Sequence, residues 1–98
     1  MIIELKKFGS TLTSRDDGRG AFIAFKPSLN GIYNNEEIEI NFTGVNTFSP
    51  GWGDEFVVNI IKNYKNKVIL LNTQNKSVIA TLDLLGDING IEFNFRQS

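Results

Sequence analysis

The fold of this chain is decided by residues 37–56, which read EIEINFTGVNTFSPGWGDEF. From Ile38 to Phe42 apolar and polar residues alternate, and this is the period of a strand with one buried face. A turn rich in small residues follows. Asp54 and Glu55 then suit the first turn of a helix, because the helix dipole is positive there. The stretch predicts a strand, a turn and a helix N-terminus in succession.

The helix that follows the turn is the most regular of three predicted helices. Its apolar stripe has helical spacing and comprises Phe56, Val57, Ile60, Ile61 and Tyr64. An earlier helix begins at Ser14, whose hydroxyl suits an N-cap. We expect that helix to end or kink at Lys26, because Pro27 disfavours helical geometry there. A third helix covers residues 76–85 and ends at Gly86.

Three further strands complete the order β-α-β-α-β-α-β. Residues 1–8 predict an edge strand, and residues 68–72, which are almost entirely apolar, predict a central one. Residues 91–96 alternate again and predict the last strand, after a turn at residues 89–90. Because a helix separates each pair of consecutive strands, we expect right-handed crossovers and a largely parallel sheet.

The alternating strands indicate where the helices lie. If helices covered both faces of the sheet, Glu37, Glu39 and Glu92 would be buried without evident partners, at a cost of a few kcal/mol each. We therefore expect a single α/β domain over residues 1–98, with about four strands in a mostly parallel or mixed sheet and three helices packed mainly on one face. Two side chains of the central strand then lie on the less covered face. That face is a surface for a homodimer or a partner, unless long side chains of the other strands cover it.

Composition limits the chemistry of the chain. Its 98 residues include ten Lys and Arg and eleven Asp and Glu, but no His and no Cys. These absences exclude a Ser-His-Asp triad, a thiolate nucleophile and a metal site built on His or Cys. Asp83 and Asp87 lack a third carboxylate nearby, so a solvated helix end is favoured over a cation site. We expect a protein that is not an enzyme and holds neither cofactor nor metal.

Charge and hydropathy limit the partners and the location. A net charge of −1 lacks the basic footprint that nucleic-acid binding needs. No apolar run approaches the roughly 18 residues of a membrane span, and the first residues do not form a signal peptide. We therefore expect a cytoplasmic protein that binds neither nucleic acid nor membrane.

The strand, turn and helix start together predict a binding surface. Exposed amides at the carboxyl end of a sheet and the start of a helix accept an anion, a phosphorylated hydroxyl or a partner's carboxylate. The candidate partner-binding residues are Thr47, Ser49, Gly51, Trp52, Gly53, Asp54 and Glu55. An equally supported interpretation is that the glycines merely permit a tight turn and that Trp52 packs in the core.

The first predicted helix carries a candidate anion site. Arg15 and Arg19 are four residues apart and share one side of the helix, where two guanidiniums could hold a phosphate or carboxylates. The favoured alternative is a solvated face on which Asp16–Asp17 supply the counter-charges. Gly18 and Gly20 each cost up to about 1 kcal/mol of helix stability relative to Ala. They indicate a close approach by a backbone or a ligand, or a helix that begins later.

The turn and the helix after it resemble the signature of a known family, the small bacterial STAS-like proteins. These are relatives of the STAS domains of anti-sigma-factor antagonists. The similar stretches are residues 42–45 (FTGV) and, after a short gap, residues 49–56 (SPGWGDEF). Ser14-Arg15, Gly18-Arg19 and the strand that ends at Asn72 also match, so the resemblance covers most of the chain. It implies a sheet with helices packed mainly to one side.

The resemblance also implies a regulatory role. In the antagonists, a Ser at the start of the corresponding helix is phosphorylated by a kinase with a histidine-kinase-like ATP-binding fold. The unphosphorylated form binds that kinase and releases a sigma factor. Carried onto this sequence, the acceptor position falls at Gly51, and the Asp before the acceptor pair falls at Ser49. Gly51 has no hydroxyl; Thr47 and Ser49 are nearby hydroxyls off the matching position, and Ser49 is the candidate phosphoacceptor.

These observations lead to three functional hypotheses. The first is a non-catalytic regulatory module that binds a protein partner, such as a kinase-like ATPase, through residues 47–55. The second is a small-ligand or phosphate-binding domain that uses amides near residues 51–53 together with Arg15 or Arg19. An enzyme is the third, because no acid–base pair can be named in the sequence. A component of a bacterial conflict or phage-related system is a further possibility.

Overall fold

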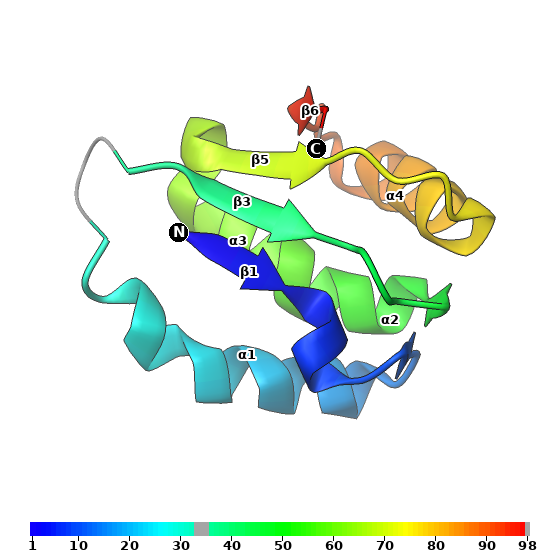
Figure 1. The fold of residues 1–98 in the computed structure, drawn as a ribbon, viewed down its shortest axis with the longest axis horizontal. Coiled ribbons are helices and arrows are strands. Elements are labelled where there is room, and N and C mark those ends of the chain that lie inside the picture. The colour runs from blue at the N-terminus through cyan, green and yellow to red at the C-terminus, as the bar shows by residue number, and fades with distance from the viewer. Residues whose placement is uncertain (33–35, 98) are drawn as a thin grey trace.

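A parallel sheet of four strands runs through the molecule (Figure 1). The computed structural model describes residues 1–32 and 36–97. In these residues the strand order is β1-β3-β5-β6, and every neighbouring pair is parallel. The strands are β1 (Ile2–Glu4), β3 (Ile38–Asn41), β5 (Val68–Leu71) and β6 (Phe95–Arg96). β1 is an edge strand and β5 an inner one, as the sequence predicts.

Three long helices connect these strands. They are α1 (Arg15–Leu29), a continuous helix over residues 50–64, and α4 (Lys76–Asn89). The middle one consists of α2 (Pro50–Gly53), the π-helical turn η2 (Asp54–Val58) and α3 (Asn59–Tyr64), and we call it the α2–α3 helix. Right-handed crossovers between strands in this order place every helix on the same face, and Figure 1 shows the helices below and behind the sheet. The predicted α/β class is confirmed.

The first strand is shorter than predicted. It stops at Glu4, and a 3₁₀-helix, η1 (Leu5–Phe8), follows. The sequence shows the reason, because Leu5 and Phe8 are three residues apart and a 3₁₀-helix has three residues per turn. Leu5 is fully buried and Phe8 packs against the core, so this turn buries apolar surface that a continued strand would expose.

Two helix ends also differ from the prediction. α1 does not end at Lys26 but runs through Pro27 to Leu29. Pro27 lies in the last turn, so its missing N–H removes one bond near the helix end, and Leu29, only 3% exposed, holds that turn on the core. α4 passes Gly86 and ends at Asn89, and Gly90 caps it with a φ of 63°.

The last predicted strand is mostly not a strand. Only Phe95 and Arg96 pair with β5. Ile91 instead bonds back to α4 through its N–H, which donates to the Gly86 carbonyl at 3.0 Å. A Cβ at position 86 would lie 3.2 Å from the Phe93 ring. Gly86 therefore serves close packing of the returning chain rather than helix termination.

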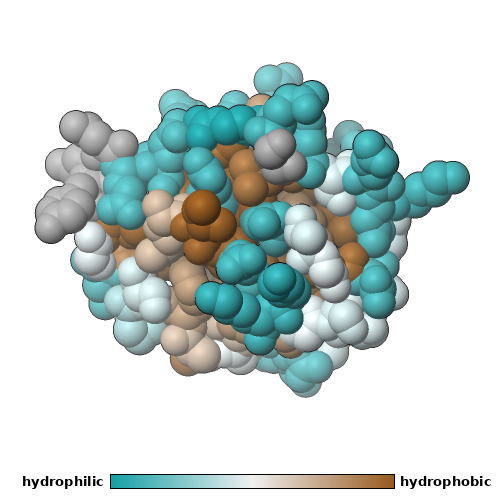
Figure 2. Space-filling view, in the orientation of Figure 1, coloured by the Kyte–Doolittle hydropathy of each residue, from teal (hydrophilic) through white to brown (hydrophobic). Residues whose placement is uncertain are grey.

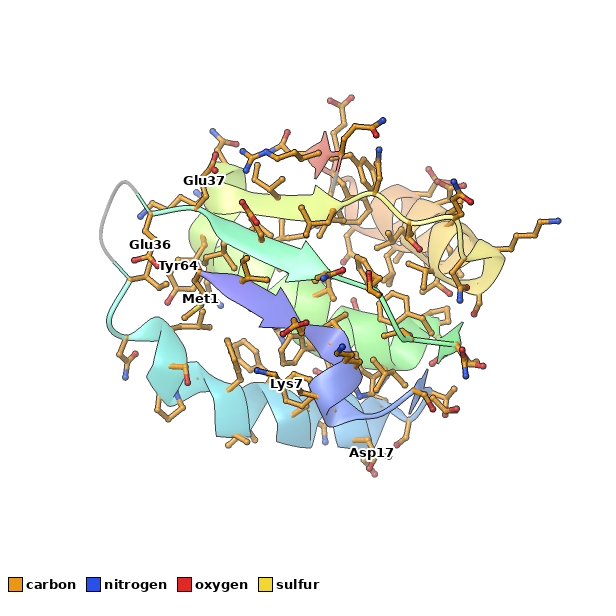
Figure 3. The ribbon with its side chains drawn as sticks, in the orientation of Figure 1. Met1, Lys7, Asp17, Glu36, Glu37 and Tyr64 are labelled. Atoms are coloured by element: carbon orange, nitrogen blue, oxygen red, sulfur yellow. The ribbon has the colours of Figure 1, made fainter. Side chains whose placement is uncertain are left out.

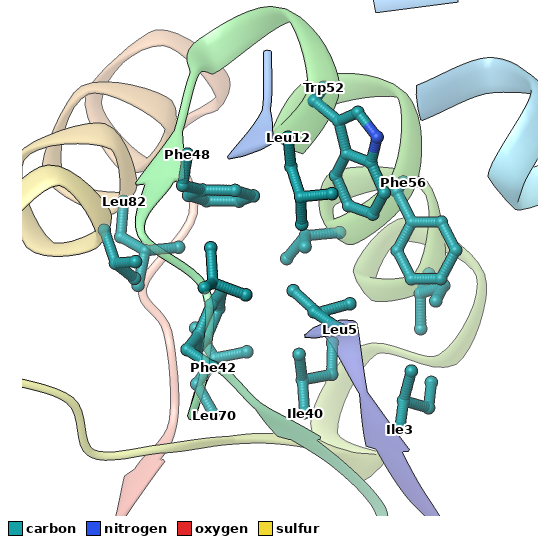
Figure 4. Close-up of a cluster of buried hydrophobic side chains, with 14 of the residues drawn as sticks. Ile3, Leu5, Leu12, Ile40, Phe42, Phe48, Trp52, Phe56, Leu70 and Leu82 are labelled. Atoms are coloured by element: carbon teal, nitrogen blue, oxygen red, sulfur yellow. The ribbon is translucent and has the colours of Figure 1, made fainter. Parts of the chain in front are cut away.

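An aromatic cluster fills the core between the sheet and the helices (Figure 4). The Trp52 and Phe56 rings stack with their centroids 4.9 Å apart, and the Phe8 ring lies 5.0 Å from Phe56. Phe42 and Phe48 meet edge to face at 5.4 Å. The rings come from η1, the strand ends and the α2–α3 helix, so the core joins the first half of the chain to the second.

Charged side chains cover part of the opposite face of the sheet. Arg96 reaches across β5, and its guanidinium donates to Glu39 at 2.8 Å and to both oxygens of Glu37 at 2.8 and 2.9 Å. The hydrogen bond to Glu37 is the main cause of the raised pKa of Arg96. Ile69, whose register partner is Glu39, is half-buried on this face. Figure 3 shows Glu37 at the sheet, and Figure 2 shows apolar surface interrupting the hydrophilic surface over the strands. Long side chains thus partly cover the open face.

Candidate partner-binding turn

A second, two-stranded sheet fixes the turn between β3 and the α2–α3 helix. It pairs β2 (Thr11–Leu12) with β4 (Thr47–Phe48), and the two strands are parallel. The amides of Asn46 and Thr47 donate to the Ser10 carbonyl at 2.7 and 3.1 Å, and the Ser49 amide donates to Leu12 at 2.9 Å. Both strands are only two residues long, and no alternation marks them in the sequence.

α4 holds the other side of the same turn. The Ser77 hydroxyl accepts from the Phe48 amide at 3.1 Å, and the Thr81 hydroxyl donates to the Phe48 carbonyl at 2.6 Å. The Asn75 side chain donates to the Val45 carbonyl at 2.9 Å and caps α4 by accepting from the Val78 amide. The amides of residues 45–49 are therefore all engaged inside the protein.

The α4 anchors are residues that the sequence prediction missed. One signal was present for Thr81, since it is a polar residue on the buried side of α4 between Val78 and Leu85. A buried hydroxyl on an apolar stripe needs a hydrogen-bond partner, and here that partner is a strand carbonyl.

Loss of the Thr81 hydroxyl should loosen the turn measurably. We expect Thr81→Val to lower the free energy of unfolding by about 1–2 kcal/mol, because the buried Phe48 carbonyl would keep only the longer bond from Ser77. Urea unfolding measures the difference. Thr11→Val, at an exposed position of β2, is the control and should change the free energy by less than about 0.5 kcal/mol. Equal effects of the two variants would contradict this anchoring role.

Arg15 and Arg19 lie on one side of α1, as predicted, but they face carboxylates of the next helix. Arg15 donates to Asp54 at 2.9 Å and lies 3.5 Å from Glu55, and Arg19 donates to Glu55 at 3.0 Å. The hydrogen bond to Asp54 is the largest cause of the raised pKa of Arg15. Asp16, 3.4 Å from Arg19, contributes one weaker contact. The expectation that Asp16 is a local counter-charge is therefore confirmed, and the helix crossing adds Asp54 and Glu55, which lie closer.

The sequence predicts a close approach by a backbone or a ligand at the two α1 glycines, and of these two only Gly18 has such a neighbour. A Cβ on Gly18 would lie 2.7 Å from the Trp52 carbonyl oxygen and 2.9 Å from its Cα, so the two helix backbones meet there. Nothing lies within 4 Å of a Cβ built on Gly20. At Gly51 the neighbour is the stem of Arg15, 3.4 Å from such a Cβ. The crossing at Gly18 is what brings the arginines to the acidic pair.

The structure divides the candidate residues into a buried and an accessible group. Trp52 is 1% exposed and stacks in the core, and Gly53 is buried against Phe48 and Leu85. These two residues shape the helix start and offer no contact surface, so the interpretation of Trp52 as a core residue is the right one. The residues with accessible surface are Thr47, Ser49, Gly51, Asp54 and Glu55.

The hydroxyl of the candidate phosphoacceptor, Ser49, is engaged. It donates to the Thr13 carbonyl instead of capping the α2–α3 helix, and the residue is half-buried. Thr47 is exposed beside it on β4. The two hydroxyls therefore differ in access, and a modification of Ser49 has to displace its bond to Thr13.

The described residues were also searched for a metal site and for a membrane-spanning helix, and the chain was compared with known proteins. Within residues 1–32 and 36–97, no three side chains of the metal-ligating acidic type come together as a cation site. None of the helices in this described part has the length and apolarity to cross a bilayer. Comparisons of the chain with protein-family models, with curated protein sequences and with solved structures found no match.

Proposed function

We propose that this chain is a STAS-like, non-catalytic regulatory module that binds a protein partner, as anti-sigma-factor antagonists do. The proposed partner is a histidine-kinase-like ATPase or another signalling protein. The proposed contact surface consists of Thr47, Ser49 and Gly51 together with the charged side chains at the helix crossing, Arg15, Arg19, Asp54 and Glu55. We call this the signature surface.

One observation carries the proposal: the alternating charges of the signature surface come from two different helices and lie beside a rigidly held turn. Arg15, Arg19 and Asp54 are about a third to a half exposed, and exposed ion pairs contribute little to stability. Such a pattern of charges gives specificity and orientation in protein association. The arrangement of the helices on one face also agrees with what the resemblance implies.

The hydrogen bonds of the turn favour a protein partner over a small anion. An anion site at residues 51–53 needs free, accessible amides, but the Gly53 amide donates to the Ser49 carbonyl at 3.0 Å and Trp52 is buried. Arg15 and Arg19 are also paired with carboxylates, which an anion would have to displace. A partner with its own charges can instead extend the existing network.

Calorimetric titration with a purified histidine-kinase-like ATPase from the same organism tests the proposal. We expect binding, and we expect Arg19→Glu to weaken it at least about tenfold, because the new carboxylate lies beside Glu55. Lys26→Glu makes the same charge change on the same helix, about two turns away, and should bind like the unmodified protein. Absence of binding, or equal losses in both folded variants, would contradict the proposal.

The same pair of proteins, the chain and the ATPase, is used to test Ser49 as a phosphoacceptor. After incubation with ATP and the ATPase, intact mass spectrometry would detect an added phosphate, and Ser49→Ala would lose it. Retention of the phosphate in Ser49→Ala would assign the modification to another hydroxyl, with Thr47 the exposed neighbour.

A further inference from the structure

A groove runs along α4 on the side that faces β6, away from the signature surface. Two adjoining hollows of about 280 and 430 Å³ form it, and they share Leu82 and Asp83. Gly53 of the α2–α3 helix packs against Leu85 on the other flank of α4. The groove and the signature surface therefore lie on opposite sides of one helix.

The first hollow of the groove is mostly apolar, whereas the second mixes polar and apolar surface. The first hollow is lined by Ile79 and Phe95, which are 41% and 53% exposed although both are large apolar side chains. The second is lined by Ile91 and Phe93. The Phe93 and Phe95 rings meet edge to face with centroids 6.2 Å apart, so they form one aromatic surface.

Carboxylates follow the rim of the groove. Asp83, Asp87 and Glu92 line it, and within the described residues none of the three has a cationic group within 4.0 Å. The carboxylates of the sheet face and of the helix crossing, by contrast, are matched with arginines. Lys76, at the first turn of α4, stands about two turns before Asp83. Lys62 and Lys65 line a neighbouring hollow together with Glu92, so the negative charge of the rim is centred on Asp83 and Asp87.

We propose that this groove docks a short Lys- or Arg-bearing segment of a protein partner. Carboxylates and aromatic rings both attract cationic groups. The aliphatic stems of Lys and Arg, and an apolar residue between them, would cover Ile79 and Phe95. The occupant is defined by this combination, because neither an acidic segment nor a nucleic acid matches the rim charge.

A second copy of the chain fits the groove less well. In a two-fold contact each surface meets itself, so Asp83 and Asp87 of one copy would approach the same carboxylates of the other. Like charges placed together across an interface cost several kcal/mol. The rim charge therefore selects a basic partner over self-association.

Two synthetic peptides of opposite charge test the inference. The groove follows α4 from Ile79 to Gly90, about 17 Å, which an extended peptide of about six residues spans. Fluorescence anisotropy is measured with a labelled peptide of alternating Lys and Leu and with its Glu and Leu counterpart. We expect the Lys peptide alone to bind, more weakly as salt increases.

Charge reversal of the rim locates the site. Asp83→Lys combined with Asp87→Lys should lower the affinity for the Lys peptide at least about tenfold and should allow the Glu peptide to bind. Asp17→Lys is the control, because Asp17 is an exposed carboxylate on α1, at the far side of the molecule (Figure 3). It should leave the affinity unchanged.

Four results would overturn the inference. They are no binding of the Lys peptide, equal binding of both peptides, an Asp17→Lys effect as large as that of the double reversal, or a dimer in sedimentation that Phe95→Ser dissociates. Should the double variant fail to fold, the site is located instead by the changes in amide chemical shift that the Lys peptide causes in the unmodified protein. Changes on α4 and β6 support the groove, and changes confined to other elements overturn it.

Discussion

Replacing Trp52 with alanine should lower the free energy of unfolding by about 3–5 kcal/mol. The indole is 1% exposed and packs against three phenylalanine rings, with the Phe56 ring stacked at 4.9 Å. Its removal leaves a cavity at the point where η1, β4 and the α2–α3 helix meet. Since a domain of this size is stable by only about 5–15 kcal/mol, the loss is a large share of the total.

Urea unfolding followed by circular dichroism measures this loss. Trp52→Phe is the matched variant, because it keeps an aromatic ring in the cluster and should cost clearly less than the alanine substitution. A cost below about 1 kcal/mol for Trp52→Ala would contradict the central position of the indole in the core.

Alanine at the two glycines of α1 should change stability in opposite directions. Gly18→Ala should destabilise the protein by about 1–3 kcal/mol, because its Cβ would lie 2.7 Å from the Trp52 carbonyl and force the helix backbones apart. Gly20→Ala places its Cβ in open space and should stabilise the helix by about 0.5–1 kcal/mol. Thermal unfolding of both variants gives the comparison. Stabilisation by Gly18→Ala equal to that by Gly20→Ala would contradict the close crossing.

The prediction for Trp52 affects how the signature surface is tested. A variant at Trp52 changes the core, so a lost interaction would not identify a contact. Arg19 is about half exposed and lies at the helix crossing, so its substitution reports on the surface itself.

Periodic patterns predicted β3 and the α2–α3 helix correctly, but the alternation over residues 91–96 predicted a strand of which only Phe95 and Arg96 form β6. The alternation over Ile38–Phe42 and the stripe from Phe56 to Tyr64 each reflect one buried face, and the structure buries those faces. Short-range rules failed where tertiary packing decided. Pro27 stays inside α1, and Gly86 stays inside α4 because the returning chain packs closely against it.

The candidate site was predictable only in part. The sequence predicts Asp54 and Glu55 in a first helical turn, but the helix begins four residues earlier, at Pro50. The sequence also does not show that these carboxylates meet Arg15 and Arg19. Their pairing depends on a helix crossing between residues 36 and 39 positions apart in the chain. The two-residue strands β2 and β4 are too short to leave a period in the sequence.

Hydrogen–deuterium exchange of the chain with and without the kinase-like ATPase tests the central claim most directly. The proposed function predicts slower exchange on binding in peptides that cover residues 47–55 and 15–19. Binding that leaves exchange in both segments unchanged, with slower exchange only on the open face of the sheet, would contradict it.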